Sequence, residues 1–175
     1  ISFYPKREMD YIDPQSKVVH FKGNAQMKYD LLVAVPPHTS CEAVRNSELT
    51  RDGPWIPVDR YTLRTEYDDV YAIGDVTKIP TPSGKVPALP KAGVFAEEQA
   101  KVAAHNIASE LSGVDGVKWD GYGICFLETG YGKAGMVRGN FYGEEAPEPR
   151  MRNPSRLWHW GKVLLERRWL GRLFR

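Results

Sequence analysis

The sequence predicts an α/β protein, which in this chain takes the form of strand and helix segments of the α+β type. Three observations carry this prediction. Residues 31–35, "LLVAV", form a continuous apolar run, and residues 92–111 repeat small and apolar side chains at helical spacing. Residues 121–143 hold two strand-like runs joined by a glycine-rich turn.

The first part of the chain is typical of short strands and turns. A break at residues 14–16 separates two strand-like runs, and "KGNAQ" at residues 22–26 is a second turn. The apolar run at residues 31–35 lacks polar alternation, which favours a strand covered on both faces, as in a parallel or mixed sheet. Pro36 and Pro37 end it.

The middle of the chain is less regular. Residues 41–49 predict a short helix, and residues 53–59 predict an extended segment. Residues 70–73 are typical of a short buried strand, which is followed at once by Gly74 and Asp75. A loop rich in Pro and Gly, residues 78–90, leads to the next helix.

The strongest helical pattern covers roughly residues 92–111, and Gly113 is placed to end it. We expect its inward face to consist of Ala96, Ala100, Ala103, Ile107 and Leu111. The strands of residues 121–143 predict a β-hairpin. A last helix is expected from about Pro154, with Asn153 as its N-cap.

The composition is that of a soluble globular chain: 175 residues, 42% hydrophobic and 26% charged. No signal peptide or membrane-spanning run is recognisable. Because the first residue is Ile1, we expect the chain to be a piece of a longer protein. Two cysteines point to a reducing compartment, and no Cys and His residues have metal-like spacing, so no metal site is expected.

Charge is distributed unevenly along the chain. Residues 150–175 hold eight Lys or Arg and a single acid, Glu166, a net charge of +7 that leaves −5 for residues 1–149. Three of the five tryptophans lie in the same segment. This combination suits the anionic surface of a membrane, and it equally suits a helix packed on its own domain with a basic outer face. No nucleic-acid motif accompanies the charge, so nucleic acid is not an expected partner.

Asp75 is the first candidate for chemistry. Ligands of open α/β sheets bind beyond the carboxyl ends of strands, where this carboxylate would lie and could accept hydrogen bonds from ligand hydroxyls. Gly74 would allow close approach of the backbone. Lys91, Ala92 and Gly93 open the long helix, where free N–H groups and an ammonium would favour an electron-rich group. Taken alone, Gly74-Asp75 also fits a simple turn and Lys91 a solvated surface lysine.

Four segments, in this order, carry a family resemblance: "YDLLVAVPPH", "VDRYTLRTEYDDVYAIGDV", "PKAGVFAEEQAKVAAHNIASEL" and "GICFLETGYGKAGMV". They resemble the C-terminal half of FAD-dependent flavoproteins of the pyridine nucleotide-disulfide oxidoreductase superfamily, and within it the sulfide:quinone oxidoreductases. The resemblance extends to about residue 150. The strand–GxGxxG–helix segment that holds the FAD pyrophosphate in such proteins is not present in this chain. We therefore expect the chain alone not to retain stoichiometric FAD.

The resemblance implies a domain organisation. Residues 1–30 would end a second, nicotinamide-type nucleotide domain of a fold with two dinucleotide-binding domains. Residues 31–113 would form the C-terminal part of the FAD-binding domain, and residues 114–175 a domain of a β-hairpin and a basic helix.

The resemblance also implies roles for the candidate residues around FAD. Asp75 would bind the ribityl hydroxyls, with Gly74 giving close approach and Val76 beside it. The C2=O and N1 edge of the isoalloxazine would face the Lys91 side chain and the backbone of Ala92 and Gly93.

Three further residues would lie near the flavin ring: Phe95 and Phe126 in a quinone pocket, and Cys125 as the catalytic residue. In sulfide-oxidising members of the family, a cysteine at this place in the hairpin is part of a redox pair, whose partner normally lies upstream of the region present here. Cys41 does not match that partner. Since free cysteines are often simply buried, a packing role for Cys125 stays open.

The resemblance therefore implies an FAD-dependent enzyme, inactive as this piece alone, that passes electrons from sulfide, a small reduced donor, through FAD to a quinone. A type II NADH dehydrogenase-like flavoprotein is one alternative, and a non-catalytic binding or dimerisation module that has lost its flavin half is another. The expected location is the cytoplasm, with peripheral attachment to the inner face of the cell membrane and a homodimer left open.

Overall fold

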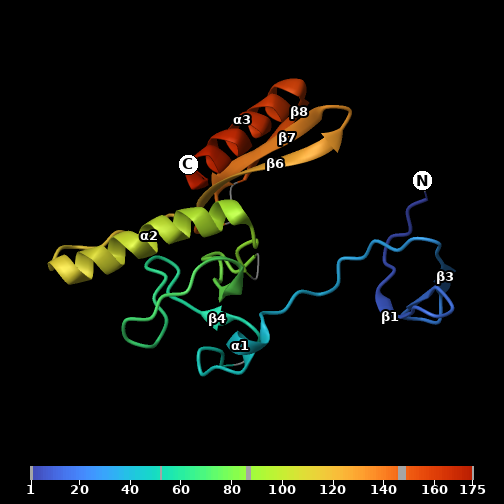
Figure 1. Cartoon of the computed structure of the whole chain (residues 1–175), viewed down its shortest axis with the longest axis horizontal. Helices are drawn as coiled ribbons and strands as arrows, with labels where there is room; N and C mark the ends of the chain where they lie inside the picture. The colour runs from blue at the N-terminus through green and yellow to red at the C-terminus, as the bar shows by residue number, and fades with distance from the viewer. Residues whose placement is uncertain (1, 52, 86–87, 146–148, 175) are drawn as a thin grey trace. The chain divides into compact units, whose positions relative to one another are not determined.

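The computed structural model describes residues 2–51, 53–85, 88–145 and 149–174. It contains two compact units, Ile1–His38 and Thr39–Arg175. Helices and sheets are mixed and the fold is of the α+β type, as predicted (Figure 1). None of the helices in the described ranges is both long and apolar enough to span a bilayer.

The first unit is a small antiparallel meander. Strands β1 (Met9–Asp13), β2 (Val18–Phe21) and β3 (Gln26–Lys28) pair in the order β1-β2-β3. Asp13 shapes the first turn, because its carboxylate accepts hydrogen bonds from the backbone N–H of Gln15 at 2.9 Å and of Ser16 at 3.3 Å. The short strands and turns predicted for residues 1–30 are confirmed.

The strand predicted for residues 31–35 does not form. The segment has no strand partner in the described structure, and Leu31, Val33 and Val35 are 83%, 86% and 79% exposed. A strand covered on both faces needs neighbouring strands and overlying helices, and the described residues supply neither at this position.

The second unit begins with short elements. Helix α1 (Glu42–Arg45) is followed by strand β4 (Ile56–Pro57), which runs parallel to β5 (Thr77–Lys78). Residues 70–73 were expected to be a strand, but they make a single antiparallel bridge, Arg64 to Tyr71. The chain then turns through the short 3-10 helix η1 (Gly74–Val76).

Helix α2 (Gly93–Ser112) confirms the predicted long helix, and Gly113 ends it in the left-handed conformation, with φ +67°. The predicted inward face was wrong at its C-terminal end, because Ile107 and Leu111 are 44% and 86% exposed. The buried face is instead formed by Phe95, Gln99, Ala103, Asn106 and Ser109. Asn106 belongs there because its side-chain oxygen accepts the N–H of Val117 at 2.7 Å and its NH₂ group donates to the Val117 carbonyl at 3.1 Å. These two bonds hold the segment that follows the helix.

The C-terminal part is a three-stranded antiparallel sheet with a helix on it. Strands β6 (Tyr122–Gly130) and β7 (Lys133–Asn140) form the predicted hairpin, and β8 (Arg150–Ser155) pairs with β7. Helix α3 (Arg156–Leu173) lies along this sheet, mainly against β7 (Figure 1). Its N-cap is Ser155, whose hydroxyl accepts the N–H of Trp158 at 3.3 Å, and not Asn153 as predicted, because residues 150–155 are extended by pairing with β7.

One core joins α2 to the C-terminal sheet. Phe95 is 2% exposed and packs edge-on against Trp119 and Phe141, with ring centroids 5.9 and 5.1 Å apart. Gly123 of β6 allows this approach, since a Cβ there would lie 2.2 Å from the Phe95 ring. The buried cluster comprises Leu63, Ile79, Leu89, Phe95, Ala103, Trp119 and Tyr142.

Candidate functional site

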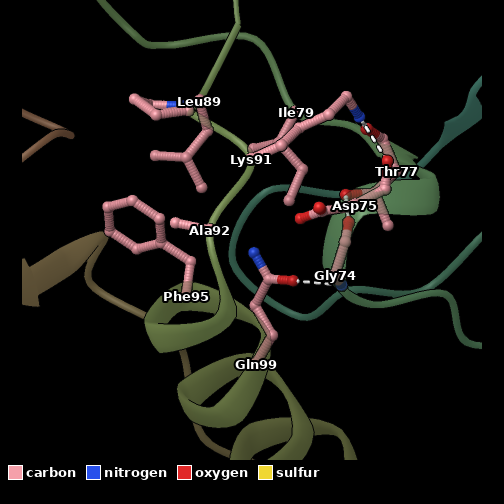
Figure 2. A pocket seen from close by; sticks show the side chains of 10 residues that line it. Gly74, Asp75, Thr77, Ile79, Leu89, Lys91, Ala92, Phe95 and Gln99 are labelled. Carbon is pink, nitrogen blue, oxygen red and sulfur yellow. Dashed lines mark hydrogen bonds between the residues drawn. The ribbon is translucent and has the colours of Figure 1, made fainter. Parts of the chain in front are cut away.

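A small pocket lies where the start of α2 meets η1 (Figure 2). Its volume available to a water-sized group is about 10 Å³, close to what one water molecule needs. The pocket brings together five of the residues predicted from the sequence: Gly74, Asp75, Lys91, Ala92 and Phe95. Val76 follows Asp75 in η1, and Gly93 is the first residue of α2.

Gly74 needs to be glycine on two counts. Its φ of +72° lies in the left-handed region, and a Cβ on it would lie 3.2 Å from the Cβ of Ala96 in α2. Its N–H donates to Oε1 of Gln99 at 2.6 Å, and its carbonyl accepts the Thr77 hydroxyl at 2.7 Å. The turn that presents the Asp75 carboxylate is therefore fixed from both sides.

The ammonium of Lys91 braces this turn. It donates to the backbone carbonyl of Asp75 and to that of Thr77, the latter at 2.9 Å, and it lies 3.7 Å from the ring centroid of Trp55. Burial lowers the pKa of Lys91, while the neighbouring Asp75 charge opposes that shift. The predicted contact of Lys91 with the edge of a flavin stays a prediction.

No described side chain caps the N-terminus of α2. Its N-cap is Ala92, which offers no side-chain acceptor for the first N–H groups of the helix. These N–H groups, with the positive end of the helix dipole, suit an electron-rich ligand atom.

Cys125 and Phe126 occupy opposite faces of the C-terminal sheet. Strand residues alternate, so Cys125 shares its face with Gly123, which contacts Phe95 of α2. Phe126 faces α3, where a Cβ on Gly161 would lie 3.8 Å from its ring. Burial raises the pKa of the Cys125 thiol.

The predicted quinone-pocket residues are thus separated by the sheet: Phe95 lies in the core on the α2 side, and Phe126 lies under α3. Nothing in the packing around either residue tests their role toward a quinone, which stays a prediction.

One residue of the pocket, Gln99, was not found from the sequence. It lies on the buried face of α2, one turn after Phe95 and one turn before Ala103. A polar residue on a buried helical stripe would have been the signal, but the inward face was expected to be the alanine face.

Helix α3 has two different faces. His159 and Lys162 face the sheet and contact the Glu128 carboxylate at 3.0 and 3.7 Å. Leu157, Trp160 and Leu164 are 71%, 65% and 69% exposed. Basic side chains flank that exposed stripe: Arg156, Arg167 and Arg168. Arg175, the last residue of the predicted basic segment, lies outside the described residues.

Comparisons with known proteins give related sequences and a related fold. A "Sulfide:quinone oxidoreductase, mitochondrial" of Dictyostelium discoideum is 30% identical over 131 residues, 73% of this chain and 27% of that protein. The protein of the same name from Schizosaccharomyces pombe is 33% identical over 122 residues, 69% of this chain and 24% of that protein. The chain thus spans about a quarter of the length of these relatives. No family model matches the sequence.

Among solved structures, the sulfide:quinone oxidoreductase of the hyperthermophilic bacterium Aquifex aeolicus has the same fold over 93% of this chain and 39% of its own length, with a TM-score of 0.73 and 21% identity. The family resemblance predicted from the sequence is confirmed by these relatives.

Proposed function

Since this chain is a homologue of part of the sulfide:quinone oxidoreductases, we propose that it contributes to an FAD-dependent oxidoreductase that passes electrons from sulfide to a quinone. The observation that carries this proposal is the pocket at Gly74-Asp75, a feature expected from the resemblance and formed by residues from two separate segments. FAD, when bound, would accept the electrons of the donor and release them to the quinone.

The residues present fit the ribityl part of FAD. The Asp75 side chain is exposed at the pocket and only accepts hydrogen bonds, which suits hydroxyl groups. Gly74 lets the backbone come close, and the start of α2 offers N–H groups nearby. In this proposal Lys91 acts by holding the carbonyls of Asp75 and Thr77, so that the carboxylate keeps its place.

The test is flavin binding to the full-length protein that contains this chain. Asp75→Asn should weaken FAD binding by about 10-fold or more, because hydrogen bonds to a charged acceptor are the stronger ones. Asp68→Asn, which changes an exposed carboxylate of the preceding loop, is the matched control and should leave FAD binding unchanged. Equal FAD affinity in both variants would remove Asp75 from the site.

The identity of the electron donor is tested by adding sulfide or NADH to the full-length protein with its flavin oxidised. Under the proposal sulfide bleaches the flavin absorbance and NADH does not, whereas a type II NADH dehydrogenase-like protein would show the reverse. A full-length protein that binds no flavin would favour the non-catalytic module instead.

For Cys125 we propose the redox role that the resemblance implies. Its place in β6 supports this, while its raised pKa means that the thiol is protonated at neutral pH before any partner acts on it. Cys125→Ser should abolish reduction of the flavin by sulfide, and the exposed Cys41 gives the matched control Cys41→Ser. Unchanged reduction in Cys125→Ser would leave packing as the role of this cysteine.

We also propose that α3 rests on a membrane surface. The support is its outward stripe of Leu157, Trp160 and Leu164 with arginines alongside. Tryptophan and arginine favour the headgroup level of a bilayer, where rings and cations meet anionic lipid. The relatives are named as mitochondrial proteins, and the cytoplasmic location expected from the sequence stays a prediction.

A further inference from the structure

The side chain of Gln99 makes one hydrogen bond that fixes its orientation. Its Oε1 accepts the N–H of Gly74 at 2.6 Å. A backbone N–H can only donate, so the atom facing it must be the amide oxygen, and the other end of the amide must be the NH₂ group. The assignment therefore follows from chemistry and not from the shape of the side chain.

The NH₂ end of Gln99 is aimed into the pocket. The residue is 2% exposed, its one hydrogen bond among the described residues uses Oε1, and Nε2 opens onto the pocket instead of being enclosed by protein atoms. Figure 2 shows this nitrogen and the Asp75 carboxylate on the pocket side of their residues. Because Nε2 opens onto the pocket and the amide is already oriented by its bond to Gly74, Nε2 is placed to donate to a group that enters there.

The two groups complement each other. The Asp75 carboxylate can only accept a hydrogen bond, and Nε2 of Gln99 can only donate one. A hydroxyl does both at once, and the pocket volume of about 10 Å³ suits a group of that size, whereas an aromatic ring is far too large for it.

We infer that Gln99 is a ligand-binding residue, and that the pocket is a hydroxyl site in which Gln99 donates to, and Asp75 accepts from, one hydroxyl of a polyhydroxylated chain. Naming that chain as the ribityl chain of a flavin rests on the proposed function; the hydroxyl site itself does not.

Gln99 has a second effect, on the position of Asp75. Its oxygen holds the N–H of Gly74, the residue whose left-handed φ directs the chain into η1. The same amide thus sets the direction of the acceptor and supplies the donor. A useful variant must still accept the Gly74 N–H but must no longer donate into the pocket.

Gln99→Glu meets that requirement. An ionised carboxylate still accepts the Gly74 N–H, but it presents an oxygen where the NH₂ group was. The matched control is Glu98→Gln, which makes the converse exchange one residue away on the exposed side of α2. Thermal melting of each variant checks that the fold is retained.

The probes are riboflavin and lumiflavin, which share the ring system but differ in that lumiflavin has a methyl group in place of the ribityl chain. In the full-length protein freed of flavin, Gln99→Glu at pH 9 should raise the Kd for riboflavin by about 10-fold or more and leave that for lumiflavin unchanged. At pH 6, where a buried carboxyl is protonated and can donate, part of the riboflavin affinity should return. Equal effects on both flavins would overturn the inference while leaving the proposed function intact.

A third probe, ribitol, separates the inference from the proposed function and does not depend on a variant folding. If ribitol shifts the side-chain NH₂ resonances of Gln99 in the wild-type protein but not in Asp75→Asn, the hydroxyl site is supported even if no flavin binds. If the wild-type protein binds FAD but neither ribitol nor riboflavin, the hydroxyl site is overturned and the proposed function stands. If it binds none of the three, both proposals are overturned.

Discussion

Cys125 and Phe126 are neighbours in sequence, but they lie on opposite faces of one β-sheet. Cys125 is on the face that meets α2 through Gly123 and Phe95, and Phe126 is on the face that meets α3. Any chemistry at the thiol and any contact at the phenyl ring therefore take place on opposite sides of the sheet. An electron path from one to the other would have to cross the sheet.

The position of Cys125 leads to a prediction about thiol reactivity. Because burial raises its pKa, Cys125 should be alkylated by iodoacetamide more slowly than the exposed Cys41 at pH 7.5. Its rate should continue to rise with pH beyond the range of an ordinary thiol. Mass spectrometry of the two cysteine-containing peptides measures both rates. Faster labelling of Cys125 at neutral pH would mean that a thiolate is present and that burial is not what governs its pKa.

The contact between Gly123 and Phe95 predicts a packing effect. Gly123→Ala would place a Cβ 2.2 Å from the Phe95 ring, so it should lower the free energy of unfolding by about 1–3 kcal/mol. Trimming the ring with Phe95→Leu should recover part of that loss, since residues in contact are energetically coupled. Urea denaturation of the single and double variants gives the coupling.

Gly161→Ala in α3 is the control for that experiment. Its added Cβ would meet Phe126 at an ordinary 3.8 Å, and alanine favours the helix, so it should not destabilise the protein. If Gly123→Ala and Phe95→Leu changed the free energy of unfolding additively, the two residues would not be coupled and the expected packing effect would be contradicted.

The side chains of Tyr71 and Arg64 predict a pH effect through Glu110. Both donate hydrogen bonds to its carboxylate, Tyr71 with the larger influence, and they hold the pKa of Glu110 below its ordinary 4.5. A carboxyl whose pKa is lower in the folded state stabilises the fold above pH 4.5, and this contribution is lost as the pH falls through the lowered value. The melting temperature should therefore fall less between pH 5.5 and pH 3 in Glu110→Gln than in the wild type. Glu144→Gln, at an exposed residue, should follow the wild-type curve.

The exposed stripe of α3 predicts lipid binding that depends on one face of the helix. Trp160→Ser should weaken flotation with anionic liposomes by about 10-fold or more, the expected effect of losing one buried aromatic side chain. Trp169→Ser is the matched control, since Trp169 is two and a half turns further along, at about 3.6 residues per turn, and so lies on the other side of the helix. Equal loss in both variants would mean that tryptophan content, and not the stripe, decides binding.

The sequence predicted the elements whose structure is set by residues a few positions apart, and it missed those set by contacts between distant segments. The hairpin of β6 and β7 and the helix α2 were predicted because glycine turns, helical spacing and the C-terminal Gly113 act within a few residues. The capping residue of α3 was missed because pairing with β7 extends the chain as far as Ser155. Such a pairing joins segments distant in sequence and leaves no local pattern.

The pocket was predicted in the same uneven way. Gly74 and Asp75 could be identified from the sequence because a glycine and an acid directly follow an apolar segment. The inward face predicted for α2 was right at Ala103, which is buried, and wrong at Ile107 and Leu111, which are exposed. Only the three-dimensional contact of Gln99 with Gly74 identifies the buried face and the extra donor.

The exposed run at residues 31–35 has a practical consequence for anyone who produces this chain in isolation. These five residues are apolar and uncharged, three of them (Leu31, Val33 and Val35) are largely exposed, and they pair with no strand in the described part of the chain. Segments of this kind seed intermolecular β-pairing. Precipitation of the isolated chain should thus begin at this segment, and a single lysine in place of Val33 would be the first change to try for keeping it in solution.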